Sequence, residues 1–167
     1  MIKSFVMKPK VQIVYASLTG NTQEIADYLA ACFAKSDVQI ELNECQQVEA
    51  AEFLNADICV VCTYTYGSAG DLPDEIEDFF VDLGELNLKG KVYGVLGSGD
   101  SYYGYFCKST EDFDIQFQTT GAIRGAEILK IESNPEEADK KLISSFADKL
   151  LKTWEKEILD RWKRNEK

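Results

Sequence analysis

The sequence predicts an α/β fold with three layers, in which a doubly wound, five-stranded parallel sheet lies between two layers of helices. Short apolar runs alternate with segments of helical periodicity along most of the 167 residues. This alternation is typical of a parallel sheet with crossover helices. The run at 57–62 is continuously apolar after its first residue, as expected for a strand that helices cover on both faces.

The first half of the chain supplies three of the expected strands. We expect strands at 11–15, 38–43 and 57–62, a helix at 22–35 and a short helical turn at 48–54. The helix follows from Ile25, Leu29 and Phe33, which recur every four residues and therefore share one face. The second strand alternates apolar and polar residues, which indicates an edge position.

The second half continues the alternation. We expect helices at 74–83 and 105–120, strands at 91–96 and 126–131, a glycine-rich loop at 97–104, and a final helix from residue 135 onward. Ile76, Phe79 and Leu83 have helical spacing, and Pro135 suits the first turn of a helix. A chain of this length forms one domain with a single core. We divide it into an N-terminal arm (1–10), a domain (11–154) and a C-terminal helix extension (155–167).

The composition narrows the function classes. The net charge of −11 argues against nucleic acid and anionic membranes as partners, and favours proteins with basic surfaces. No run approaches membrane-spanning length, and the first ten residues lack the apolar core of a signal peptide. Five cysteines without disulfide-type spacing favour the reducing cytoplasm. The absence of histidine removes the commonest general base and zinc ligand, so we expect no catalytic and no metal-binding residue.

The most informative segment is the hydroxyl-rich turn at 17–22, which follows the first strand and opens into a helix. Backbone N–H groups converge at a helix N-terminus, where the helix dipole favours an anion. Ser17, Thr19, Thr22 and Asn21 add neutral donors, and Gly20 lets the backbone approach a ligand closely. The turn holds no Lys or Arg. It therefore fits a monophosphate better than a triphosphate, which calls for Lys and Mg²⁺.

Two further loops, at 63–71 and 97–107, combine flexible backbone with tyrosines. Each leaves the carboxyl end of a predicted strand, and parallel sheets bind ligands at that edge. A flat heterocycle is held well between aromatic rings with backbone amides along its edge. Together with the phosphate turn, the loops indicate a mononucleotide with a large ring. The alternative is that these tyrosines are ordinary half-buried loop aromatics.

Three other motifs are incomplete. Cys59 and Cys62 have the spacing of a redox dithiol, but on a strand these positions point to opposite faces. No lysine follows Gly20 as a P-loop requires. Gly97 and Gly99 begin a dinucleotide fingerprint, but Tyr102 occupies the position of its third glycine.

The three loops resemble those of short-chain flavodoxins over residues 11 to about 154. The turn 17–22 matches the family's phosphate loop, 65–67 with Leu72 and Pro73 matches its second flavin loop, and 97–101 with 103–107 matches its third. The resemblance implies the strand order 2-1-3-4-5, with FMN bound at the switch between strands 1 and 3. Two features depart from the family's pattern: Tyr66 stands where Trp is common, and the second loop is about one residue longer.

The resemblance also implies a role for each loop. The turn 17–22 would bind the FMN phosphate, Tyr66 and Tyr103 would cover the two faces of the isoalloxazine, and the Gly67 peptide would lie near N5. Backbone groups of 98–100 would contact the pyrimidine edge. The candidate FMN-binding residues are Ser17, Leu18, Thr19, Gly20, Asn21, Thr22, Tyr64, Thr65, Tyr66, Gly67, Ser68, Ser98, Gly99, Asp100, Tyr103, Tyr105, Phe106 and Cys107.

These residues predict a low-potential one-electron carrier with non-covalently bound FMN. Its partners would be a flavodoxin reductase and acceptor oxidoreductases with basic docking surfaces. The acidic run is Asp71, Asp74, Glu75, Glu77, Asp78, Asp82 and Glu85; it is either a solvated helix face or a surface that steers such partners. One alternative is a flavodoxin-like NAD(P)H:quinone or flavin reductase, which needs bases beside the flavin. Another is a flavoprotein that activates a single metalloenzyme. A receiver-type signalling domain would need acids at the ends of strands 1 and 3, which this chain lacks.

Overall fold

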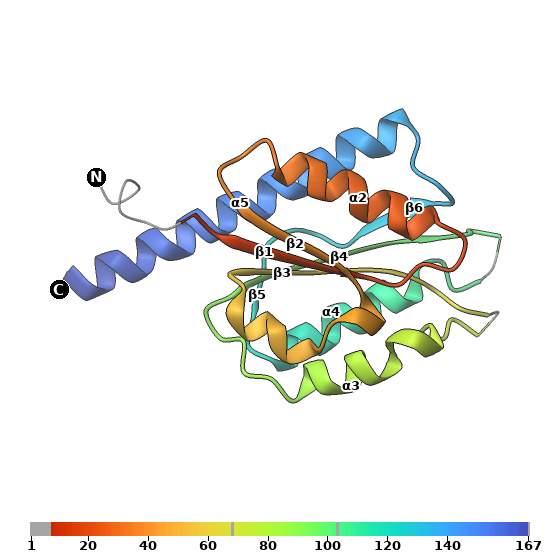
Figure 1. Cartoon of the computed structure of the whole chain (residues 1–167), viewed down its shortest axis with the longest axis horizontal. Helices are drawn as coiled ribbons and strands as arrows, with labels where there is room; N and C mark the ends of the chain where they lie inside the picture. Colours follow the sequence, from red (N-terminus) through yellow and green to blue (C-terminus); the bar gives the residue numbers. More distant parts are fainter. Residues whose placement is uncertain (1–7, 68, 103, 167) are drawn as a thin grey trace.

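A parallel sheet lies between two layers of helices (Figure 1). The computed structural model describes residues 8–67, 69–102 and 104–166. The strands are β1 (Lys10–Tyr15), β2 (Gln39–Glu44), β3 (Ile58–Tyr64), β4 (Val92–Gly99), β5 (Ile123–Arg124) and β6 (Leu129–Glu132). Their order is β2-β1-β3-β4-β5, and β6 also pairs with β4. The predicted fold class and strand order are confirmed, with β2 at an edge.

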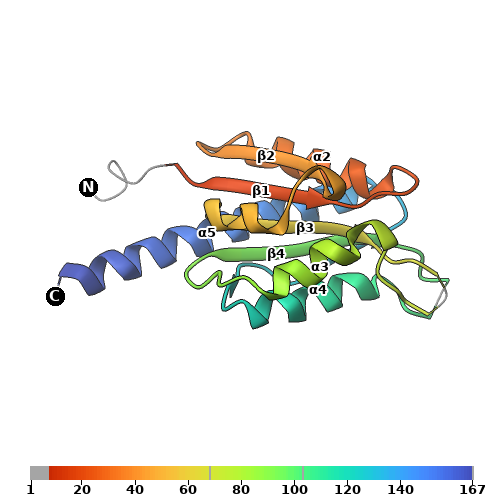
Figure 2. The same cartoon turned by 60° about the horizontal axis from the view of Figure 1, so that its bottom comes forward.

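Helices cover both faces of the sheet (Figure 2). The α-helices are α2 (Asn21–Phe33), α3 (Glu77–Gly84), α4 (Lys108–Thr119) and α5 (Glu137–Glu166). Short 3₁₀ segments occupy η1 (Cys45–Gln47), η2 (Ala50–Asn55) and η3 (Asp74–Ile76). One apolar core lies under α2 and α5, and the other lies under α3, α4 and η2.

The side chains of β3 alternate between these two cores. Val60 and Cys62 pack under α2 and α5, whereas Cys59 and Val61 pack on the opposite face. The uninterrupted apolar run of β3 is therefore explained by burial on both sides. The structure confirms that the Cys59 and Cys62 thiols face apart, so they do not form a dithiol pair.

The fifth strand differs from the prediction, because two separate segments replace the continuous strand at 126–131. The four residues 125–128 lie opposite Gly94 and Val95 of β4. The close packing of α5 explains the break, since a Cβ atom on Gly125 would lie 2.6 Å from a Leu150 methyl carbon. Residues 123–124 pair with β4 before this break, and 129–132 pair after it.

The end of β4 is also longer than expected. The sequence predicted a loop from residue 97, but β4 continues to Gly99 because β6 pairs with it there. A Cβ atom on Gly97 would lie 2.0 Å from the Thr63 carbonyl oxygen of β3. Glycine is therefore required at this close approach between the two strands. The helix predicted from residue 105 begins later, at Lys108.

The last helix, α5, extends well past the end of the sheet (Figures 1 and 2). Trp154 is buried against the core, and the Arg161 guanidinium donates to the Gly90 carbonyl oxygen at 3.2 Å. Trp162, one turn from Ile158, is 44% exposed. The segment 155–166 thus continues the same helix without a break. In the described parts of the chain, none of the helices has the length and apolar character needed to span a membrane.

A polar network centred on the buried Asp114 joins α4 to β4 and β5. The Asp114 carboxylate accepts hydrogen bonds from the Tyr93 phenol at 2.8 Å, from Arg124 Nε at 3.0 Å and from Gln118 Nε2 at 2.9 Å. Burial and the bond to Asp114 raise the pKa of Tyr93 to about 12. The bond to Asp114 also raises the pKa of Arg124. A single carboxylate therefore connects β4, β5 and α4.

We expect Asp114→Asn to lower the free energy of unfolding by about 1.5–3 kcal/mol, because hydrogen bonds to a buried charged group are lost. The matched control on the same helix is Asp112→Asn, whose partner Lys108 lies at the surface; it should cost within about 0.5 kcal/mol. Urea unfolding of both variants measures the difference. Equal stabilities for the two would contradict the role given to Asp114.

Candidate functional site

Three loops meet at the carboxyl edge of the sheet and enclose a hollow of about 290 Å³. The loops follow β1, β3 and β4, as the sequence predicted. The residues that line the hollow are Leu18, Thr19, Asn21, Thr22, Tyr64, Thr65, Ser98, Gly99, Asp100 and Ser133. The structure therefore brings together nine of the predicted site residues and adds Ser133.

The first loop leaves the N-terminus of α2 open. Gly20 is the N-cap residue with φ 100°, and no side chain caps this helix end. A left-handed backbone of this kind favours glycine. The Ser17 hydroxyl accepts a hydrogen bond from Gly20 N–H at 3.1 Å and thereby shapes the turn. The uncapped N–H groups of the first helical turn remain as anion donors beside Thr19 and Asn21.

A buried hydrogen bond forms the floor of the hollow. The Thr22 and Ser98 hydroxyl oxygens lie 2.6 Å apart, and both residues are buried. The contact joins the start of α2 to the end of β4. It therefore fixes the distance between the first and third loops.

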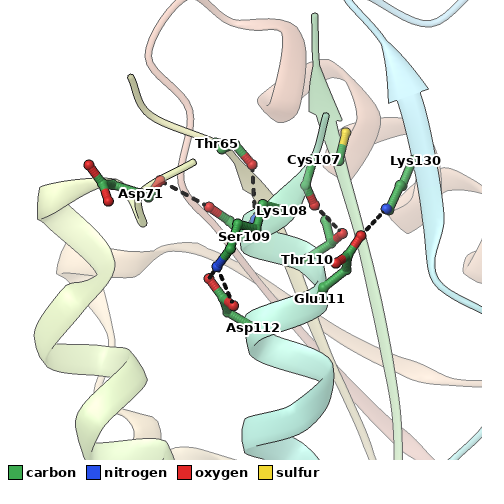
Figure 3. A network of polar contacts seen from close by, with 9 residues as sticks. All are labelled: Thr65, Asp71, Cys107, Lys108, Ser109, Thr110, Glu111, Asp112 and Lys130. Atoms are coloured by element: carbon green, nitrogen blue, oxygen red, sulfur yellow. Dashed lines mark hydrogen bonds and ion pairs between the residues drawn. The ribbon is translucent and has the colours of Figure 1, made fainter. Parts of the chain in front are cut away.

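The second loop is closed at its neck by Tyr66 and Asp71. Tyr66 N–H donates to the Asp71 carbonyl oxygen at 2.8 Å, and Asp71 N–H donates back at 2.9 Å. Ser109 at the start of α4 holds both sides of this neck, as Figure 3 shows. Its N–H donates to Thr65 Oγ1 at 3.0 Å and its hydroxyl donates to the Asp71 carbonyl oxygen at 3.2 Å. The Tyr66 side chain at the neck and Gly67 (φ 69°) just beyond it are exposed.

Tyr64 lines the hollow with its phenol already engaged. The hydroxyl group donates to the Glu75 carboxylate, 2.9 Å from Oε2 and 3.1 Å from Oε1. Burial, together with the hydrogen bond and charge of Glu75, raises the pKa of the Tyr64 phenol. One member of the acidic run is therefore a structural acceptor, while the other six are exposed at the surface.

The last part of the third loop lies beside the second loop. A Cβ atom on Gly70 would lie 2.7 Å from the Cβ of Tyr105, so the two loops are in contact. Tyr105 is half exposed and Phe106 is half buried. The Cys107 thiol is buried, and burial raises its pKa to about 12. Cys107, with φ 55°, precedes α4 as its N-cap and does not line the hollow.

Two predicted residues, Ser68 and Tyr103, lie outside the described residues. Ser133, which follows β6, also lines the hollow and was not predicted from the sequence. The signal that could have found it is the Asn134-Pro135 turn after the fifth predicted strand. That turn marks a fourth carboxyl end at the same edge of the sheet.

The donor set fits the phosphate of FMN. Among the described residues that line the hollow there is no Lys, Arg or His, and one acid, Asp100. Hydroxyls, amides and an uncapped helix end can hold a phosphate through hydrogen bonds and the helix dipole. Within the same described ranges, no group of three or more His, Cys, Asp or Glu could hold a metal ion.

Comparison with known proteins decides the family. The sequence model of the flavodoxin family matches residues 13–146. The chain belongs to the flavodoxin family. Probable flavodoxin 2 of Bacillus subtilis (strain 168) is 31% identical over 144 residues, which are 86% of this chain and 95% of that protein.

Solved flavodoxin structures have the same fold as this chain. A flavodoxin from Streptococcus pneumoniae TIGR4 superposes with a TM-score of 0.84 at 48% identity, over 86% of this chain and 99% of that chain. A short-chain flavodoxin associated with a bacterial microcompartment gives a TM-score of 0.85 at 42% identity, over 87% and 99%. The predicted family is confirmed. As a flavodoxin, the chain is an electron carrier whose cofactor is FMN.

The hydrogen bond on the floor of the hollow can be measured by a double-mutant cycle. We expect Thr22→Val and Ser98→Ala each to destabilise the protein, with a coupling of about 0.5–1.5 kcal/mol between them. Thermal or urea unfolding of the two single variants and the double variant gives this coupling. Strictly additive losses would show that the two hydroxyls do not interact.

Proposed function

We propose that this flavodoxin is a one-electron carrier and not an enzyme, and that the hollow at the carboxyl edge holds its FMN. The observation that carries the proposal is the convergence of neutral donors on a hollow whose described lining holds no Lys, Arg or His. When bound, FMN supplies reversible one-electron chemistry. The protein supplies binding, orientation and an electrostatic environment.

Each loop has its own task in this proposal. The turn 17–22 binds the phosphate through hydroxyls and the N-terminus of α2. Backbone groups of 98–100 contact the edge of the ring system, and the exposed ring of Tyr66 covers one face. By resemblance to the family, Tyr103 covers the other face. Tyr64, Thr65, Ser68, Tyr105, Phe106 and Cys107 complete the surroundings of the cofactor.

The charges near the site favour electron donation. Asp100 lines the hollow, and the acidic run starts at Asp71 in the second loop. A negative charge added to the cofactor would be repelled by these carboxylates, since Coulomb energy rises in a partly desolvated site. We therefore propose a low reduction potential.

The acidic run also supports docking to basic redox partners, such as a flavodoxin reductase and acceptor oxidoreductases. A second hollow of about 490 Å³ lies beside Tyr66 between the second loop, α3 and α4. Its described lining includes the acids Asp71, Asp74, Glu77 and Asp112, and the apolar residues Leu72, Phe80 and Val81. Such a surface attracts cationic side chains and raises the association rate.

The charge pattern gives no support to a nicotinamide-dependent reductase. Such an enzyme usually needs bases for the phosphates of NAD(P)H. Lys108 is the one base among the described residues that line the two hollows, and its ammonium group pairs with Asp112 at 3.0 Å.

The five free, buried cysteines are consistent with the reducing cytoplasm as the location of the protein.

The purified protein tests the proposed function directly. We expect a yellow protein. In a mixture with NADPH and a quinone it should not oxidise NADPH steadily, but it should pass electrons from NADPH to the quinone once a reductase is added. Visible absorbance follows both reactions. Steady NADPH oxidation without added reductase would indicate an enzyme, and a colourless protein that does not bind added FMN would refute the carrier.

The phosphate site is tested by Thr19→Val. We expect weaker binding of FMN, by about 0.5–1.5 kcal/mol for one lost hydrogen bond, and unchanged binding of riboflavin, which has no phosphate. Titration of the apoprotein with each ligand, followed by flavin fluorescence, provides both affinities. An equal loss for the two ligands would place Thr19 away from the phosphate.

A further inference from the structure

Three hydrogen bonds attach the last residue of β4 and the loop that follows it to the end of β6 and the next residue. The Glu132 carboxylate accepts from Ser101 N–H at 2.7 Å and from the Ser101 hydroxyl at 2.5 Å. One residue later, Ser133 N–H donates to the Gly99 carbonyl oxygen at 2.8 Å. These bonds enclose residues 99–101, and two of these residues, Gly99 and Asp100, line the hollow.

The β6 end of this attachment is firmly held in the sheet. Residues 129–132 pair with 96–99 of β4, and Ile131 is fully buried. On the adjoining face, Lys130 forms an ion pair with Glu111 of α4 (Figure 3). By contrast, Asp100 and Ser101 are exposed, and the 2.9 Å bond from Tyr102 N–H to Asp100 Oδ1 shapes their turn without joining it to the sheet.

We propose that Glu132 is a positioning residue for FMN, because it holds the third loop against β6 so that Gly99 and Asp100 face the ligand. The inference rests on the proposed function of the hollow. Glu132 does not line the hollow itself. It acts through Ser101, and the loop pays less conformational entropy on binding when this contact already orders it.

If charge alone mattered, removal of the Glu132 carboxylate would strengthen FMN binding, whereas loss of a positioning contact weakens it. FMN carries a negatively charged phosphate, so the loss of a nearby negative charge should tighten binding if Coulomb repulsion dominated. Loss of the loop attachment should weaken binding. The sign of the change in affinity therefore distinguishes a positioning residue from a mere charge.

The contact also has a defined pH dependence. The hydrogen bonds from Ser101 lower the pKa of Glu132. A carboxylate whose pKa is lower in the folded state than in the unfolded state keeps its hydrogen bonds at every pH above the ordinary carboxyl pKa. It loses them as the pH falls through its folded-state pKa. Among the described residues, the neighbouring charged or titratable groups include Asp100 and Tyr102 on the loop, Lys130 on β6, and Cys107, on which the charges of Glu132, Lys130 and Glu111 all act.

The experiment is a titration of the apoproteins with FMN. We expect Glu132→Ala to weaken FMN binding about tenfold, and Glu132→Gln, which keeps one acceptor oxygen, to weaken it about threefold. The charge control is Glu127→Ala, an exposed acid in the segment that leads into β6. It should leave the affinity unchanged or slightly tighter. Ser101→Ala should also weaken FMN binding. Because both substitutions break the same contact, the double variant should lose less affinity than the sum of the two single losses.

A readout without flavin accompanies the titration. The protection of the Ser101 amide against hydrogen exchange, measured relative to an unstructured peptide at the same pH, should be high in the apoprotein at neutral pH. It should fall only at a pH below the ordinary carboxyl range of about 4, because hydrogen bonding lowers the pKa of Glu132. In Glu132→Ala this protection should be low at both pH values. Unchanged affinity and unchanged exchange in Glu132→Ala would overturn the inference while leaving the carrier function intact. A wild-type protein that binds no FMN would overturn the proposed function, and the role of Glu132 toward the cofactor with it.

Discussion

Parallel alignment of the strands is the constraint on which the site depends. The register places Tyr15, Cys62, Leu96 and Leu129 in one row across β1, β3, β4 and β6. Every chain segment that leaves this row emerges at the same edge. The loops therefore meet although they are far apart in sequence, and the buried Thr22–Ser98 contact closes the gap between two of them. The topology of the sheet thus assembles the site from separate segments of the chain.

The distribution of charge suits this arrangement. Neutral hydroxyls and the free end of α2 face the hollow, while carboxylates gather on the second loop, η3 and α3. A Lys in the first loop would hold a phosphate more strongly, but it would also stabilise added electrons on the cofactor. A turn of hydroxyl groups can bind an anion without that electrostatic cost. Glu75 shows that an acid in the run can also have a structural role, since it accepts from Tyr64.

Local sequence predicted much of this molecule. The β3 run and the four-residue spacing in α2 report burial directly, so both elements and the loops that follow the strands could be identified. The break between β5 and β6 was not predictable, because it depends on how closely Leu150 of α5 approaches Gly125. The same reason applies to the Glu132–Ser101 contact, which joins residues 31 positions apart. The burial of the Cys107 thiol, which does not line the hollow, was likewise not predictable, because it depends on tertiary packing.

The long α5 helix has a practical consequence for how the molecule can be handled. It runs out past the sheet at the end opposite the loops after β3 and β4 (Figures 1 and 2). A linker, a dye or an electrode surface joined to its final turn would leave the mouth of the hollow facing the solvent. The helix thus provides a rigid mount by which this flavodoxin can be oriented for direct electrochemistry.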